Sequence, residues 1–438
     1  VLDVYTYEYD KANNQISKHE IINGVDKDET TYEYDKLNRL KMVTEPSDKT
    51  TSYTYDASGN RLEEIIAEPG KTTIYKEYRY SDSNRLSHVY KKENDENGAI
   101  IDVTSFGYDF NGNMVHSSVD LQNFVIYEYD KLNRQTKVKK NNYITVGKSS
   151  YNAEGLRVEK TVGTETTKYL YEYDKVLMEF DGGGICKARN IYGINLISRE
   201  VDNETLFYLY NGHADVTALV DSTGNVKAHY YYDAFGVIIE DETDRGGKDN
   251  PIRYSGYQYD EETGLYYLNA RMYDPVIARF MQEDTYRGDP NDPLSLNLYT
   301  YCQNEPIMYY DPSGFEQMSI KEILNLHYGT YDIAYEDSEN WFVFKVDGKI
   351  TTISQRELQA ESKNGEWFIE SDVFYDNISP QKTSEWLKNT IYAYDEEDRN
   401  GNKHKAFYVE GEGPKASFGT EPFALKLGRI ETGIVKVE

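Results

Sequence analysis

The chain has 438 residues, enough for two or three domains, and a formal net charge of −28. That charge repels phosphate backbones and anionic lipid, so the chain is not expected to bind nucleic acid. No apolar run approaches the about 18 residues that a membrane span requires, and no signal peptide precedes the first repeat.

Two cysteines, Cys186 and Cys302, exclude a disulfide scaffold and an all-cysteine zinc site. Two unpaired thiols are the expectation, and one long-range bridge is the alternative. The sequence contains no phosphate-binding loop, zinc-protease motif or nucleophile elbow. We therefore expect no cofactor and no metal.

A recurring phrase fills the first part of the chain: Tyr-x-Tyr-Asp, then Asn or Gly, then Arg-Leu. It is clearest from Tyr32 and from Tyr53. The Asp position, which holds Ser or Asn in two copies, falls at residues 10, 35, 56, 81, 109, 130, 152 and 174. Intervals of this length indicate a repeat architecture.

Each repeat is predicted to be an antiparallel β-hairpin. The two Tyr rings are two residues apart, which places them on one face of a strand. Asp then opens a turn by accepting from nearby backbone N–H groups, and Gly or Asn follows where the chain needs a positive φ. Because helical periodicity is absent here, the fold class is mainly β.

The phrase loosens at Asp181–Gly184, and a denser string of motifs follows between residues 208 and 314. A second break follows Gly314. All three tryptophans lie beyond it, and possible helix starts appear for the first time, at Ser319, Ser354 and Ser379. A hairpin is predicted from Trp341–Val346 and the segment 350–353. The tail is therefore expected to be a small α+β domain.

The motifs between residues 208 and 315 resemble those of the Rhs/YD-repeat family and its repeat-associated core domain. The resemblance divides the chain into repeats at 1–180, a core domain at 181–315 and a variable C-terminal domain at 316–438. It implies a β-spiral that forms a hollow shell. Because residue 1 already lies inside a repeat phrase, we expect a fragment of a longer protein whose repeats form an open, curved sheet.

The same resemblance implies the C-terminal part of a bacterial polymorphic toxin, secreted or displayed at the cell surface. The shell would enclose and present a variable effector tail. Its partners would be a cognate immunity protein and the upstream repeats of the parent. The alternative is a surface structural or adhesive protein whose tail is a non-enzymatic recognition module, for which the tail's three tryptophans are suited.

Many members of that family cut themselves just after the core, at a motif that this chain matches from Pro306 through Asp311, Pro312 and Gly314. Phe315 replaces the usual Leu. The resemblance implies aspartic-protease-like chemistry and cleavage after Phe315.

By position, the catalytic pair would be Asp311 and Asp284, with Asp292 as a weaker candidate for the second role. Thr285 stands where the family has Pro after the second Asp. Arg271, Asp274 and Arg279 complete the core motif. The simpler interpretation is that Asp-Pro-x-Gly is only a tight turn that ends a domain.

The tail has 14 Lys and Arg against 23 Asp and Glu, and it contains no cysteine. This composition does not favour a phosphate-binding nuclease or a zinc deaminase. His404 with Glu410 is a candidate acid–base pair, against the simpler interpretation of a structural or solvated histidine. The acidic run 395–398 is expected to be a solvated turn, with a calcium site as the alternative.

Overall fold

The computed structural model describes residues 3–314, apart from 23, 194, 244–249, 289 and 291, and separate strand segments between residues 318 and 436. The chain divides into two compact units, Val1–Ile320 and Lys321–Glu438. Within the described residues, the structure contains no helix with the length and apolarity needed to cross a membrane. Cys186 is exposed, Cys302 is buried, and both are free thiols.

Strands dominate the first unit. The long sheet comprises β1 Asp3–Tyr9, β2 Gln15–Ile22, β3 Val25–Tyr34, β4 Leu40–Thr44, β5 Thr50–Tyr55, β6 Arg61–Ala67, β7 Ile74–Tyr80, β8 Leu86–Glu93, β9 Ile100–Tyr108, β10 Met114–Ser118, β11 Phe124–Tyr129, β12 Gln135–Lys140, β13 Ile144–Tyr151, β14 Arg157–Val162, β15 Glu165–Glu172, β16 Lys175–Asp181, β17 Cys186–Tyr192, β18 Leu196–Val201, β19 Glu204–Tyr210, β20 Val216–Val220, β21 Val226–Tyr232 and β22 Ile238–Thr243. The core segment that follows contains β23 Gln258–Asp260, β24 Leu265–Leu268, β25 Arg271–Asp274, β26 Arg279–Phe280 and β27 Tyr309–Tyr310, with 3₁₀ turns at Tyr254–Gly256, Pro293–Leu296 and Cys302–Asn304. A further 3₁₀ turn, Asp82–Asn84, connects β7 and β8.

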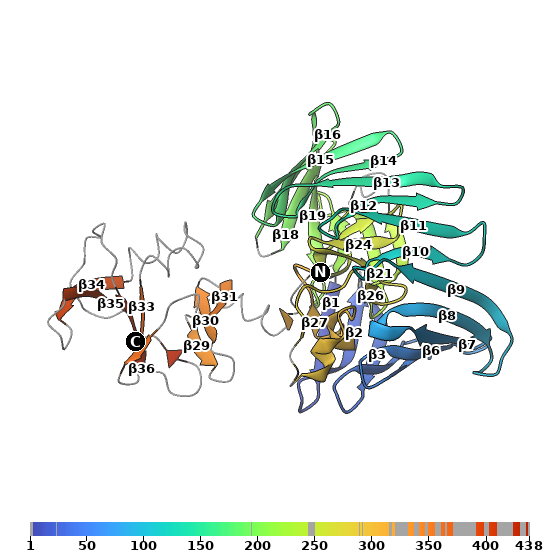
Figure 1. The fold of residues 1–438 in the computed structure, drawn as a ribbon, viewed down its shortest axis with the longest axis horizontal. Coiled ribbons are helices and arrows are strands. Elements are labelled where there is room, and N and C mark those ends of the chain that lie inside the picture. The colour runs from blue at the N-terminus through green and yellow to red at the C-terminus, as the bar shows by residue number, and fades with distance from the viewer. Residues whose placement is uncertain are drawn as a thin grey trace. The chain divides into compact units, whose positions relative to one another are not determined.

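The first 22 strands form one continuous antiparallel sheet in which each strand pairs with the next along the chain. Figure 1 shows them side by side in chain order, curving around the yellow core segment. β1 pairs with β2 and β22 pairs with β21, so the sheet is open. The predicted fold class is confirmed. The sheet also continues across residue 181, where we placed a domain boundary, and that boundary stays a prediction.

In several repeats the second Tyr of the phrase connects neighbouring hairpins. Tyr55 donates its hydroxyl to the backbone carbonyl of Leu40 at 2.8 Å, and Tyr151 donates in the same way to Gln135 at 2.6 Å. In both cases the acceptor is the first residue of the returning strand of the preceding repeat. A β-bulge accompanies each of these tyrosines, for example between Thr54 and Tyr55.

The turns are held by Asp side chains, as the sequence predicts. Asp35 Oδ1 accepts from the backbone N–H groups of Leu37 and Arg39, and Asn38 between them has a φ of 59°. A turn ladder then links successive turns, because the residue after the positive-φ position donates to the next turn. The donors alternate between Asn and Arg. The bonds run from Asn14 to Asn38, Arg39 to Asp56, Asn60 to Asn84, Arg85 to Asp109, Asn113 to Asn133 and Arg134 to Asn152.

The core segment fills the concave side of the sheet. The long sheet β1–β22 is called the wall below. Leu265, Met272 and Met281 pack in one buried cluster with Leu86 and Met114 of the wall. Their burial excludes water from the inner face of β7 to β12 and supplies the main stabilisation of this contact.

Ion pairs and hydrogen bonds, which depend on direction, also connect the wall to the core segment. Arg157 binds Asp260 through both terminal nitrogens, at 2.6 and 2.9 Å, and Asn304 donates to the carbonyl of Gly59 at 2.8 Å. Arg157 lies on the wall strand β14, whereas Asp260 lies in the core segment. These bonds fix the core segment at one position along the wall.

The short strand β28 Met318–Ser319 pairs with β27 and belongs to the first unit. The second unit is described only as strands, which are β29 Asp332–Glu336, β30 Trp341–Val346, β31 Lys349–Ser354, β32 Glu361–Lys363, β33 Glu366–Glu370, β34 Ile391–Glu397, β35 Lys403–Val409, β36 Ala424–Arg429 and β37 Val435–Lys436. The predicted hairpin is confirmed by the pairing of β30 with β31. The predicted helices after Ser319, Ser354 and Ser379 lie outside the described residues. The prediction of a solvated turn at 395–398 is wrong for residues 395–397, because these residues belong to β34 and pair with β35.

Candidate functional site

Arg271 brings the two predicted carboxylates together. It lies at the start of β25, while Asp284 follows β26 and Asp311 follows β27. Arg271 Nη2 is 2.8 Å from Asp284 Oδ2 and 3.5 Å from Asp311 Oδ2. The guanidinium lies 3.6 Å from the ring centroid of Phe280, and the Arg271 side chain is buried. Two carboxylates that are 27 residues apart in sequence therefore share one buried cation.

The chain next to Asp311 is held by the same groups. Asp311 Oδ1 accepts from the backbone N–H of Ser313 at 3.2 Å and of Gly314 at 2.7 Å. Arg271 Nε donates to the carbonyl of Gly314. Gly314 has a φ of 79°, and a Cβ there would lie 2.5 Å from the carbonyl oxygen of Leu268. The predicted turn thus exists, and its last residue has room only for glycine.

The carboxyl groups bind protons more readily than exposed ones. Burial raises the pKa of Asp311 to about 6, although Arg271 opposes the shift. Burial also raises the pKa of Asp284, again against the effect of Arg271. The Asp284 charge also disfavours ionisation of Asp311. Asp311 therefore keeps its proton to a higher pH than an exposed carboxyl does, and the pKa of Asp284 is shifted in the same direction.

The remaining core-motif residues have other roles. Arg279 extends to the wall, where it donates to Asn60 Oδ1 at 3.2 Å and to the carbonyl of Asn84 at 2.5 Å. Asp274 opens a turn by accepting from Val276 N–H at 2.9 Å. The Pro306 carbonyl accepts from Tyr254 at 3.4 Å.

Three predicted site residues remain to be placed. Pro312 follows Asp311 directly in the turn, and Phe315 lies outside the described residues. Asp292, the weaker candidate, accepts from the N–H of Leu294 at the start of a 3₁₀ turn and does not join the Arg271 group.

The tail candidates are not brought together by the described residues. The backbone of His404 lies on β35, opposite Glu396 on β34. Glu410 lies outside the described residues. The proposed acid–base pair stays a prediction.

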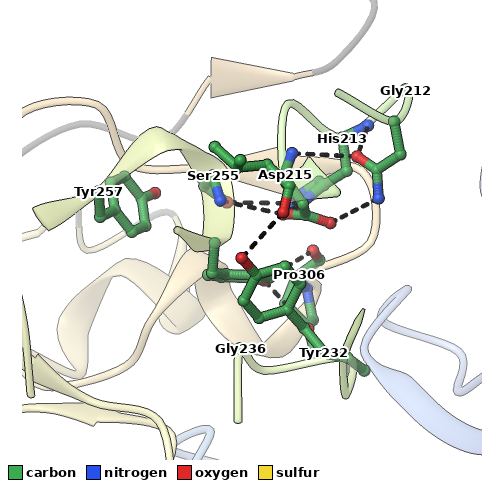
Figure 2. Close-up of polar contacts among 12 residues, drawn as sticks. Gly212, His213, Asp215, Tyr232, Gly236, Ser255, Tyr257 and Pro306 are labelled. Atoms are coloured by element: carbon green, nitrogen blue, oxygen red, sulfur yellow. Dashed lines mark hydrogen bonds and ion pairs between the residues drawn. The ribbon is translucent and has the colours of Figure 1, made fainter. Parts of the chain in front are cut away.

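Sequence reasoning missed a second buried polar group, which Figure 2 shows around His213. His213 Nδ1 is 2.8 Å from Asp215 Oδ1, and its Nε2 is 3.1 Å from the carbonyl oxygen of Tyr309. Ser255 donates its backbone N–H to Asp215 Oδ1 at 3.0 Å, and its hydroxyl is 3.4 Å from His213 Nδ1.

This group does not have the arrangement of a hydrolase triad. There the serine lies on one imidazole nitrogen and the carboxylate on the other. Here Asp215 and Ser255 both face Nδ1, and a backbone carbonyl occupies Nε2. The Asp215 charge raises the pKa of His213 against the effect of burial. Because His213 Nε2 contacts the carbonyl oxygen of Tyr309, the His213–Asp215 pair fixes the chain at Tyr309, two residues before Asp311.

Residues 4–307 match the protein family described as Teneurin YD-shell. The match covers more than half of the chain. The chain belongs to the YD-shell family. Its open sheet of consecutive hairpins and its filled concave side are the YD-shell wall and core segment.

Curated relatives of this YD-shell chain include bacterial nucleases. The tRNA3(Ser)-specific nuclease WapA of Bacillus spizizenii and the tRNA nuclease WapA of Bacillus subtilis strain 168 are each 35% identical over 302 residues. The match covers 68% of this chain and 12% of each relative. Double-stranded DNA deaminase toxin A of Burkholderia cenocepacia is 24% identical over 348 residues, covering 70% of this chain and 22% of the relative.

Among solved structures, the complex described as TcdB2-TccC3-TEV has a TM-score of 0.40 and 20% identity. It covers 72% of this chain and 17% of the matched chain. Measured against the WapA relatives, the chain spans 12% of their length, about an eighth.

Proposed function

We propose that residues 1–315 are part of the shell of a bacterial toxin and that residues 316–438 are its effector. The similarity to nuclease and deaminase relatives carries this proposal, because it extends over 68% and 70% of this chain. The names of these relatives, tRNA nucleases and a deaminase toxin, favour this function over the adhesive alternative. Secretion or display at the bacterial surface follows from the same argument, as does a cognate immunity protein.

Expression of residues 316–438 alone inside bacteria tests the effector. We expect growth arrest that is relieved by co-expression of the product of the neighbouring gene. Expression of residues 1–315 at the same level is the matched control and should leave growth unchanged. Harmless, soluble accumulation of the tail would instead support a recognition module.

We further propose that the core cuts the chain after Phe315. The convergence of Asp284, Asp311 and the Gly314 carbonyl on Arg271 carries this proposal. Water adds to the carbonyl carbon of Phe315 while an ionised carboxylate accepts its proton. The protonated carboxyl then donates to the amide nitrogen of residue 316, and the C–N bond breaks. Arg271 holds both carboxyls and the adjoining backbone in place.

Mass spectrometry of the freshly expressed full chain tests the cleavage. We expect two fragments divided after Phe315, and a single intact chain for Asp311→Asn and for Asp284→Asn. Asp292→Asn is the matched control, because Asp292 caps a 3₁₀ turn outside the Arg271 group, and it should still be cut. A wild-type chain that stays intact on incubation would refute self-cleavage. Cleavage in Asp311→Asn would refute the assigned pair.

A further inference from the structure

The hydroxyl of Tyr257 contacts the backbone at the start of the turn that contains Asp311. It accepts from the N–H of Asp311 at 2.7 Å and lies 2.9 Å from the hydroxyl of Tyr301. The Tyr257 ring also stacks on the ring of Tyr310, with 6.5 Å between the centroids and 27° between the planes. Tyr257 is buried and directly follows the 3₁₀ turn Tyr254–Gly256. A residue 54 positions away in the sequence therefore binds the chain at Asp311.

This contact complements the one that Arg271 makes with the same residue. Arg271 Nη2 lies 3.5 Å from Asp311 Oδ2, and Arg271 Nε donates to the carbonyl of Gly314 at the other end of the turn. Tyr257 thus holds the backbone of Asp311 while Arg271 faces its carboxyl group. Because only the short Asp side chain separates the two contacts, the position of the N–H determines how far the carboxyl lies from Arg271.

One aromatic cluster supports both contacts. The guanidinium of Arg271 lies 3.6 Å from the ring centroid of Phe280. The Tyr301 ring lies 6.0 Å from Phe280 and 6.4 Å from Tyr257, measured between centroids. All three rings are buried in the same cluster. Since buried rings are closely packed and have little room to shift, the cluster fixes the distance between Arg271 and Asp311.

A buried tyrosine hydroxyl needs a hydrogen-bond partner wherever it lies, so the partner's identity is what distinguishes Tyr257. In the same cluster, Tyr273 donates to the carbonyl of Phe235, in the turn between β21 and β22, at 2.7 Å. The partner of Tyr257 is instead a residue whose carboxyl faces Arg271. Burial raises the pKa of Tyr257 well above its ordinary value, so the hydroxyl stays protonated and is suited to holding the chain.

We propose that Tyr257 is a positioning residue for the self-cleavage described above, because it holds the backbone of Asp311 so that the Asp311 carboxyl faces Arg271. The inference rests on that proposed self-cleavage. Tyr257 acts through Asp311 and takes no part in the proton transfers.

The rate of cleavage in the full chain tests this role. The chain is made in a cell-free system, synthesis is stopped, and the intact fraction is followed with time. We expect Tyr257→Phe, which keeps the ring and removes the hydroxyl, to slow cleavage by about tenfold to a hundredfold, because Asp311 is displaced from Arg271. Tyr273→Phe is the matched control, because it removes a hydroxyl from the same cluster, and it should be cut at the wild-type rate.

The pH dependence of the rate separates positioning from general damage to the fold. Burial raises the pKa of Asp311, Arg271 lowers it and the charge of Asp284 raises it, and both of these neighbours are unchanged in Tyr257→Phe. We expect Asp311 in that variant to stay buried but to lie farther from Arg271. Its pKa should then rise, and the pH–rate profile should move to higher pH. Tyr273→Phe should keep the wild-type profile, and a fold that is merely less stable would lower the rate without moving the profile.

Hydrogen exchange at the Asp311 amide gives a readout that does not need cleavage. It is measured on the peptide 309–314 in the Asp284→Asn chain, which we expect to stay intact. Adding Tyr257→Phe should accelerate exchange there, because the amide loses the acceptor that Tyr257 supplies, whereas adding Tyr273→Phe should not. If circular dichroism shows that Tyr257→Phe does not fold, Tyr301→Phe takes its place. It removes the partner of the Tyr257 hydroxyl and should change rate and exchange in the same direction.

The outcomes distinguish this role from self-cleavage itself. A wild type that is cut, together with an unchanged rate in Tyr257→Phe, would overturn the positioning role and leave self-cleavage in place. Unchanged exchange at the Asp311 amide would also overturn the role. A wild type that stays intact would refute self-cleavage, and exchange alone would then decide whether Tyr257 holds Asp311.

Discussion

Glu305 shows how strongly burial in the interior shifts the pKa of a single carboxyl group. Its side chain is 4% exposed, and Oε2 accepts from the N–H of Met308 at 2.7 Å. Burial raises the pKa of Glu305 from 4.5 to about 7, although His213 and backbone N–H groups oppose the shift. The protonated form is therefore favoured on folding. Stability from this group is fully present below pH 4.5 and is lost as the pH rises through about 7.

Replacement of this carboxyl should change the pH dependence of stability. We expect the melting temperature of the wild type to fall between about pH 5 and pH 8, and Glu305→Gln to reduce that fall, because Gln has no proton to lose. His213, whose pKa is also raised, contributes with the same sign in both proteins. Glu33→Gln removes an exposed carboxyl and should keep the wild-type slope. Identical slopes for the wild type and Glu305→Gln would contradict the assignment.

At the scale of the element, the hairpins were predictable because each is specified within about ten residues. The Tyr-x-Tyr period, the Asp turn and the positive φ at Asn38 or Gly59 all act locally. The turn ladder was not predicted, since it joins residues of different repeats. Its signal was nevertheless present in the alternation of Asn60, Arg85 and Asn113 after the turns.

The candidate site was predictable only in part. Asp284 and Asp311 followed from a family resemblance, whereas the role of Arg271 depends on three strand ends meeting in space. His213 and Asp215 lie in the string of motifs between residues 208 and 314, but their sequence does not show that Tyr309 packs against them. Long-range packing of this kind leaves no period in the sequence.

At the scale of the whole first unit, β1 is an edge strand of the wall, and the turn after it has the geometry that accepts a hydrogen bond from a preceding turn elsewhere in the wall. β1 pairs with β2 and with no other strand among those described. Asn13 has a φ of 65°, the position at which Asn38 and Asn133 accept from the preceding turn. The edge therefore matches a hairpin whose turn ends in Asn, and we propose that it can accept a further repeat of this kind.

A transplanted hairpin tests this edge. In the alignment of the two phrases, Val4 corresponds to Phe124 and Asn13 to Asn133, so residues 100–123 joined ahead of Val4 place a copy of Asn113 beside Asn13. We expect the added hairpin to raise the melting temperature, because it buries the β1 edge and extends the ladder. The same chimera with Asn113→Ala in the copy should lose about 1 kcal/mol of that gain. An unchanged melting temperature, with the added hairpin removed by brief proteolysis while residues 4–314 resist, would show that β1 does not accept a further repeat.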